Sequence, residues 1–448
     1  QIVASNSAWS VETPPGHSSP VVWEDHIYLS ACVDGTLECR AYDKAKGALL
    51  WSRPVKTESL EKTHAFSNPV APSAAANAEC VIFRFGSFGL LAFSHEGKPL
   101  WETKLPPQVS RGGYGSASSP VICGDIVVQT LDSDEGGSRI VAFKTATGTK
   151  AWETERPLFT AGWSSPAICR KDGKCEIVVL GSKKLVSYAP EDGRVLWTVP
   201  GFPLETSCSP AFDGERVYCC SAALGGRSSA KFDWSGFEQL KQFDSNKDGK
   251  IQPEEVPQDF KLVIRPELPE GHPGRQLPFD IRGMIRGMDA DKDGGLTEEE
   301  WNKAMAEFEK MDTPVAMALK IGDAGSVSDR IVWQQARGVP EVPSVLAYMG
   351  KLFLIRDGGI LRCLDSQTGE VLFDERIGAA GGYSASPVGA DGRVYLASQA
   401  GVVTIIDARS NSLKVLGQAN LSEKVCATPA LVGNAIYVRT DKHLVAFR

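Results

Sequence analysis

A repeated pattern of small and aromatic residues is the feature that most restricts how this chain can fold. The pattern A-x-D-x-x-x-G-x-x-x-W first spans residues 41–51, and related copies end at Trp101, Trp152, Trp197, Phe373 and, more loosely, Trp333. A second mark, usually a small residue before Pro, occurs at Pro20, Pro69, Pro120, Pro166, Pro210, Pro343, Pro387 and Pro429. Most marks lie about 42 to 51 residues apart. Repeats of this length, with four short strands each, are typical of a β-propeller. Eight marks predict an all-β protein with eight blades.

The two ends of the chain are expected to complete one blade together. The last unit, from Pro429 to Arg448, is too short for four strands, whereas residues 8–12 near the start resemble an outer strand. Pairing of these segments would close the ring and remove an open sheet edge. We expect the repeated tryptophans to pack between neighbouring blades.

The fifth repeat is interrupted by a segment of different composition. From about Gly226 to Lys320, helix formers, acids and lysines replace the pattern of strands and glycines. We therefore divide the chain into residues 1–225, with blades one to five (first part) and the closing strand, an α-helical insert at 226–320, and residues 321–448, from the end of blade five to blade eight.

Two segments of the insert carry acidic and amide side chains at the spacing of a Ca²⁺-binding loop. DSNKDGKIQPEE, residues 244–255, and DADKDGGLTEEE, residues 289–300, both match D-x-[DN]-x-[DN]-G-x5-E. The donors expected in the first are Asp244, Asn246, Asp248, the carbonyl of Lys250, Gln252 and Glu255. Those expected in the second are Asp289, Asp291, Asp293, the carbonyl of Gly295, Thr297 and Glu300. Hard oxygen donors at these positions suit Ca²⁺. With helical patterns around them, the loops resemble a paired EF-hand with two Ca²⁺ sites.

The two loops differ in charge. The second has four acidic ligands and the first has three, with Asn246 as the neutral one. Because ligand charge sets affinity, we predict that the second site binds Ca²⁺ more tightly. Ile251 and Leu296 occupy the hydrophobic position at which paired loops form a short β-bridge. Five of the six methionines lie in this part of the chain. They indicate either the core and docking surface of a small module or a Ca²⁺ sensor that opens onto a partner.

The loops before the Pro marks form a second candidate site. In a propeller, the connection between a blade's second and third strands lies on the same face as the connections between blades, so the insert should lie beside these loops. Their aromatic and basic residues are His17, His64, Phe66, Arg111, Tyr114, Trp163 and Tyr383. These side chains either line a central funnel for a small-molecule, glycan or protein ligand, or pack on neighbouring loops and seal it.

Composition argues against a nucleic-acid partner and against a membrane span. A net charge of −7 argues against a nucleic-acid partner. No apolar run approaches the length of a membrane span, so we expect none. The chain begins at Gln1, and we expect that a signal peptide has been removed.

The eleven cysteines include two pairs around predicted hairpin turns, Cys32 with Cys39 and Cys169 with Cys175. Each pair forms either a disulfide or two small buried side chains. The sequence leaves the oligomeric state open.

Outside the insert, the A-x-D-x-x-x-G-x-x-x-W copies resemble the tryptophan docking motif of the quinoprotein propellers. That superfamily contains PQQ-dependent alcohol dehydrogenases and non-catalytic relatives such as the propeller lipoprotein of the outer-membrane β-barrel assembly machine. The resemblance implies a periplasmic or cell-surface location in a bacterium. The PQQ pocket and catalytic Asp of the dehydrogenases have no matching positions here, so we do not expect PQQ to bind. The adjacent Cys219 and Cys220 resemble a cysteine pair of some of those enzymes, but RVYCCSA is typical of a strand.

Three functions are consistent with these patterns. The first is an exported, non-catalytic Ca²⁺-binding propeller that serves as a ligand-binding or protein-binding scaffold. The second is a quinoprotein dehydrogenase, which PQQ uptake with dye-linked alcohol oxidation would support. The third is a polysaccharide hydrolase or lyase, which loss of activity on changing Trp163 or Tyr383 would support. The first is our main interpretation because the Ca²⁺ loops are the most specific motif in the chain.

Overall fold

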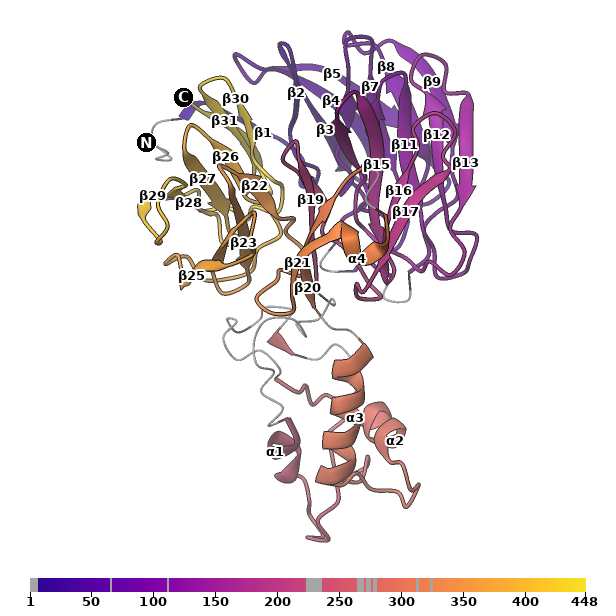
Figure 1. Ribbon diagram of the computed structural model, residues 1–448, viewed down its shortest axis with the longest axis vertical. Coiled ribbons are helices and arrows are strands. Elements are labelled where there is room, and N and C mark those ends of the chain that lie inside the picture. Colours follow the sequence, from indigo (N-terminus) through magenta and orange to yellow (C-terminus); the bar gives the residue numbers. More distant parts are fainter. Residues whose placement is uncertain are drawn as a thin grey trace.

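Eight four-stranded antiparallel sheets form a propeller from which a small helical module extends (Figure 1). The computed structural model describes residues 7–64, 67–110, 113–222, 236–263, 270, 275–276, 280–311, 314–322 and 325–448, with side chains omitted at 306–311. Each sheet is ordered from an inner to an outer strand, and the inner strands of successive sheets contact each other. The eight-bladed architecture predicted from the repeat is confirmed.

The first four blades follow the chain without interruption. Blade one contains β2 (Val21–Trp23), β3 (His26–Val33), β4 (Thr36–Asp43) and β5 (Leu49–Val55). Blade two contains β6 (Ala75–Ala76), β7 (Val81–Phe85), β8 (Gly89–Phe93) and β9 (Pro99–Lys104). Blade three contains β10 (Val121–Cys123), β11 (Ile126–Leu131), β12 (Arg139–Lys144) and β13 (Lys150–Glu155). Blade four contains β14 (Ala167–Lys171), β15 (Lys174–Gly181), β16 (Lys184–Tyr188) and β17 (Val195–Pro200).

The second half holds the interrupted blade and the closing one. Blade five contains β18 (Ala211–Phe212), β19 (Arg216–Ser221), β20 (Val315–Lys320) and β21 (Ile331–Gln335), with helix α4 (Val327–Arg330) before β21. Blade six contains β22 (Leu346–Tyr348), β23 (Lys351–Arg356), β24 (Ile360–Asp365) and β25 (Val371–Arg376). Blade seven contains β26 (Val388–Ala390), β27 (Arg393–Ala397), β28 (Val402–Asp407) and β29 (Val415–Asn420). Blade eight contains β30 (Ala430–Val432), β31 (Ala435–Arg439), β32 (His443–Phe447) and β1 (Ser7–Glu12).

The closing strand and the helical insert both lie where the sequence predicted, but the insert ends earlier than expected. Strand β1 pairs with β32 as the outer strand of blade eight, so the chain ends close the ring. The helical insert separates β19 from β20, which pair with each other in blade five. Because β20 ends at Lys320, residues 315–320 belong to the propeller, and the expected insert boundary at 320 lies too late. The insert connects the second and third strands of blade five, so it leaves the propeller on the same face as the loops that join blades.

The repeated tryptophans pack between blades, as predicted. The indole N–H of Trp152 in blade three donates to the carbonyl of Pro190 in blade four at 2.8 Å. A Cβ on Gly193 of the same turn would lie 2.4 Å from the Trp152 ring. The repeat therefore needs Gly because it is the surface on which the tryptophan of the preceding blade lies. Trp9 makes the equivalent contact with Gly47, so blade eight packs on blade one by the same rule.

A closed ring of hydrogen bonds joins the loops at the start of the inner strands. The backbone N–H of Ser119 donates to the hydroxyl of Ser165 in the next blade at 2.9 Å, and the same bond recurs around the ring. The eight residues are Ser19, Ser73, Ser119, Ser165, Ser209, Ser344, Ser386 and Thr428. Pro follows six of them, but Ala follows Ser73 and Val follows Ser344. Pro69 and Pro343 are therefore not the equivalents of the other Pro marks, because the hydroxyl residue is what the structure repeats.

Neither candidate disulfide forms, and all eleven cysteines are free. Cys39 lies opposite Ser30, and Cys32 lies opposite Leu37, so the first pair is offset along its hairpin. In the second hairpin, Cys169 lies opposite Glu176. One close pair of thiols joins different blades: the Sγ atoms of Cys123 and Cys175 are 3.3 Å apart. The pairs therefore follow the alternative interpretation, small side chains in or near the core.

Candidate calcium site and the loop face

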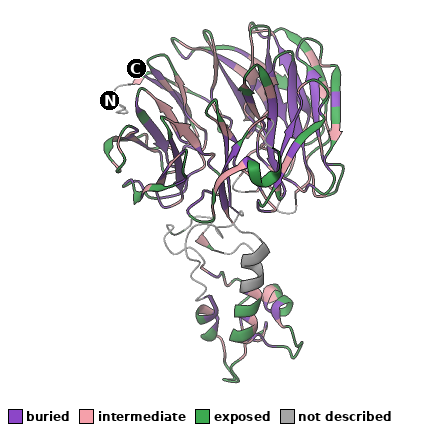
Figure 2. Ribbon diagram, in the orientation of Figure 1, coloured by how far each residue is buried: buried purple, intermediate pink, exposed green. Residues whose placement is uncertain are grey.

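The insert has a hydrophobic core of its own. It contains α1 (Gly236–Lys241), α2 (Ile281–Met288) and α3 (Glu298–Met311). Its buried core residues all lie between Phe237 and Met305, and Trp301 is 2% exposed among them. Figure 1 shows the insert extending away from the propeller, and Figure 2 shows how much of its surface is exposed. The insert is therefore a separate small module carried by blade five.

A short β-bridge holds the two predicted Ca²⁺ loops together. Ile251 and Leu296 exchange two backbone hydrogen bonds of 3.0 Å, and both side chains are buried. A Cβ on Gly295 would lie 2.8 Å from the Cβ of Lys250, so the close approach of the loops depends on Gly at that position. This pairing confirms the bridge predicted from the hydrophobic position of each loop.

The two loops have the same internal turn. In the first, the Oδ2 atom of Asp244 accepts from the N–H of Gly249 at 3.0 Å. In the second, Asp289 accepts from Gly294 at 2.9 Å. Both glycines have positive φ, +82° and +97°, which L side chains rarely adopt. In each turn this hydrogen bond folds the first acidic side chain back toward the residues that follow it.

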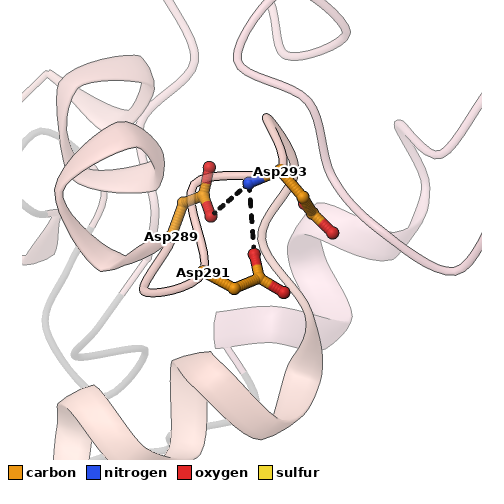
Figure 3. Close-up of side chains that lie close together, drawn as sticks. All are labelled: Asp289, Asp291 and Asp293. Carbon is orange, nitrogen blue, oxygen red and sulfur yellow. Dashed lines mark hydrogen bonds between the residues drawn. The ribbon is translucent and has the colours of Figure 1, made fainter.

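Three aspartates of the second loop lie close together (Figure 3). One carboxylate oxygen from each of Asp289, Asp291 and Asp293 lies within 4.8 Å of the others. The N–H of Asp293 donates to the other two carboxylates at 3.2 Å, which holds them in place. In the first loop, the Oδ1 atom of Asp244 is buried without a hydrogen-bond partner. Clustered anionic oxygens and an unsatisfied buried oxygen both fit a hard cation such as Ca²⁺.

The last ligand of each loop is positioned by backbone donors. The carboxylate of Glu300 accepts from the N–H of Thr297 at 3.0 Å and from that of Ala290 at 2.9 Å. The first of these bonds, with the others, lowers the pKa of Glu300 to about 2, so this side chain is anionic. Thr297 and Glu300 also form a capping box that starts α3. In the first loop, Glu255 accepts from the N–H of Gln252 at 3.0 Å.

A lysine of the first loop contacts a ligand of the second. The ammonium of Lys250 forms an ion pair with the carboxylate of Asp293, and this contact lowers the pKa of Asp293. The sequence predicts only the backbone carbonyl of Lys250 as a ligand and does not indicate this side-chain contact, because it exists only when the two loops are paired. A cation at the second site must compete with Lys250 for Asp293.

We predict that Lys250→Met strengthens Ca²⁺ binding at the second loop. Exposed ion pairs are weak, so removal of this one should raise the affinity by only a few-fold. Calorimetric titration of Ca²⁺ measures the change. Lys247→Met is the matched control, since it removes the same charge from the same loop, and a larger gain in that variant would contradict the role of Lys250.

Three residues predicted for the funnel lie together on the loop face. The rings of His64 and Tyr114 have centroids 5.0 Å apart, and those of Tyr114 and Trp163 are 5.4 Å apart. The indole N–H of Trp163 donates to the carbonyl of Gly115 at 2.8 Å, and its ring is buried. These contacts join three successive inter-blade loops into one aromatic cluster.

Two other predicted funnel residues, Tyr383 and His17, lie in other loops of the propeller. Tyr383 is 2% exposed, and its hydroxyl donates to the carbonyl of Ala379 in its own loop. Burial, with the nearby charges of Lys424 and Arg439, lowers the pKa of His17 to about 4, so its imidazole is neutral. Phe66 and Arg111 lie outside the described residues.

The adjacent Cys219 and Cys220 occupy strand β19 and are both buried. Their side chains belong to two different hydrophobic clusters, on opposite faces of blade five. The strand interpretation of RVYCCSA is confirmed. This arrangement gives no support to a bond between the two cysteines, because neighbouring side chains of a strand point apart.

These features define an eight-bladed propeller with a paired EF-hand inserted in one blade. The family model described as outer membrane protein assembly factor BamB matches residues 5–129, 35–222 and 357–448, and the chain belongs to this family of PQQ-like propellers. An EF-hand family model matches residues 237–256 and 281–306, which contain both Ca²⁺ loops.

Solved structures agree with this fold. The crystal structure of BamB from Moraxella catarrhalis matches with a TM-score of 0.58 and 11% identity, covering 98% of this chain and 96% of that one. A europium-containing methanol dehydrogenase matches with a TM-score of 0.53 and 14% identity, covering 98% and 86%. At these identities the similarity is one of fold. The curated proteins include no significant sequence match. Among the described residues, no helix has the length and apolar character needed to cross a membrane.

Proposed function

We propose that this protein is an exported, Ca²⁺-binding scaffold that binds a protein partner through the loop face of its propeller. The observation that carries the proposal is the paired loop structure: two Ca²⁺ loops, joined by the Ile251–Leu296 bridge, on a module with its own core. Bound Ca²⁺ would neutralise the clustered carboxylates and stabilise that module on the face that also carries the aromatic cluster.

The partner is proposed to be a protein because of two lines of support. The matching family model is described as an outer membrane protein assembly factor, which supports contacts with other proteins. The insert adds to the loop face a surface that rests on its own hydrophobic core. A periplasmic or cell-surface location follows from the same family relationship and belongs to the proposal.

Calorimetric titration of Ca²⁺ into chelator-treated protein, with thermal unfolding alongside, tests this function. We expect two sites, and at about 100 times its Kd each bound ion should stabilise the module by roughly 2.7 kcal/mol. The Glu255→Gln/Glu300→Gln double variant should lose most of this gain. Absence of Ca²⁺ binding would overturn the proposal. New dye-binding apolar surface on Ca²⁺ addition would identify the module as a switch, and its absence would identify a structural element.

A further inference from the structure

A cavity of about 360 Å³, lined by both polar and apolar residues, lies on the loop face between blades two and three. Its walls come from strands β7 and β11, from residues 106–109 after β9, and from the turn that follows β11. Below it, the interface between the two blades is apolar, with Ile82 and Val127 both fully buried. The cavity therefore lies where the hydrophobic packing of this interface gives way to polar side chains.

Arg84 and Gln129 face each other across this interface. Side chains of a strand alternate between its two faces. Arg84 follows Ile82 by two residues, and Gln129 follows Val127 by two, so each continues the side of its strand that faces the other blade. Both line the cavity, and they are only 2% and 1% exposed.

Each of these side chains has a buried polar atom without a partner. The amide nitrogen of Gln129 donates to the carbonyls of Ser118 and Thr130 at 3.2 and 2.9 Å, which leaves its Oε1 atom as a free acceptor. Arg84 donates to the carbonyl of Phe85, and its Nε atom is unsatisfied. Arg156, by contrast, holds both oxygens of Asp132, although the Nε atoms of the buried Arg356 and Arg439 are unsatisfied as well. A buried unsatisfied group costs free energy unless something binds to it.

The charges around the cavity favour a neutral occupant. Burial lowers the pKa of Arg84 to about 10, and the carboxylate of Glu61 opposes this effect through its charge. Two other charged residues of the lining are also matched by opposite charges, since Asp132 is held by Arg156 and Arg139 pairs with Glu153. The remaining lining includes hydroxyl groups of Ser118, Thr130 and Ser133 and the apolar surfaces of Pro106 and Pro107.

We propose that this cavity binds a neutral carbohydrate, of the size of one or two sugar rings. A sugar hydroxyl both donates and accepts, so it can donate to the Oε1 atom of Gln129 and accept from the Nε atom of Arg84. The sugar ring can rest on the two prolines. The volume lies within the range of small-molecule sites. This site is separate from the Ca²⁺ loops, so its occupation does not depend on them.

Saturation-transfer NMR with a panel of glucose, galactose, N-acetylglucosamine, maltose and chitobiose, at about 10 mM each, tests the proposal on the full chain. Lactate and glucuronate serve as anionic probes. We expect at least one neutral sugar to bind, with an affinity that falls about tenfold or more in Arg84→Met and in Gln129→Leu. Arg194→Gln changes an exposed arginine of blade four that does not line the cavity, so this control should bind as the parent protein does.

Two results would overturn the proposal: no neutral sugar binds, or binding is unchanged in both variants. Preference for lactate or glucuronate would replace the neutral class with an anionic one and would contradict it as well. Thermal unfolding checks that each variant folds, and Arg84→Lys replaces Arg84→Met if the latter does not. The Glu255→Gln/Glu300→Gln variant should keep full sugar binding, which separates this site from the proposed Ca²⁺-dependent function.

Discussion

Glu300→Gln is expected to weaken Ca²⁺ binding at the second loop by about 10- to 100-fold, and by more than Glu255→Gln weakens the first. Glu300 is the last ligand of a loop with four acidic side chains, and the carboxylates of Asp289, Asp291 and Asp293 already lie close together. Loss of one anionic ligand removes both charge and a bidentate contact. Calorimetric titration of the two single variants measures the difference.

The comparison has an internal control because the two loops share one fold. Gln keeps the size of Glu and can still accept a hydrogen bond from the N–H of Thr297, so α3 should still form in Glu300→Gln. Circular dichroism without Ca²⁺ checks this. A larger loss of affinity from the Glu255 change would show that ligand charge does not rank the two sites.

Trp152→Ala is expected to lower the free energy of unfolding of the propeller by about 3–5 kcal/mol. The ring is 8% exposed, it covers Gly193 of the next blade, and its N–H bonds to the Pro190 carbonyl. Its removal leaves a space between blades three and four that a rigid ring of sheets cannot easily close. Urea unfolding, followed by intrinsic fluorescence and circular dichroism, measures the loss.

A paired substitution shows whether the Trp–Gly contact is the cause. Gly193→Ala alone places a Cβ against the Trp152 ring and should be destabilising, but it should cost less when Trp152 is already Ala. Gly173→Ala is the matched control, since its φ of +73° is close to the +72° of Gly193 and a Cβ there would meet nothing within 4 Å. Equal costs for Gly193→Ala in both backgrounds would assign its effect to the backbone alone.

The sequence pattern alone was sufficient to predict the propeller because each repeat forms one blade from consecutive residues. Strand, turn and strand follow one another within some 45 residues, so Gly47, Trp51 and their copies could be counted directly. The Ca²⁺ loops could also be predicted from the sequence, since the expected ligands of each loop lie within twelve consecutive residues. The closing strand was found because the last unit lacked one strand and residues 8–12 matched it.

Contacts between repeats could be decided only by the tertiary structure. Residues at equivalent places in different blades have no fixed spacing in the chain. The closed ring of hydrogen bonds between the inner-strand loops therefore includes Ser73 and Ser344, although neither is followed by Pro. Cys123 and Cys175 approach each other across two blades, while the cysteines of single hairpins do not pair. Lys250 reaches Asp293 only when the loops associate, and Arg84 faces Gln129 only after blade two packs on blade three. The spacing of residues within each repeat was thus enough to predict the blades and the metal loops. Packing between blades determined which side chains meet at the candidate binding surfaces.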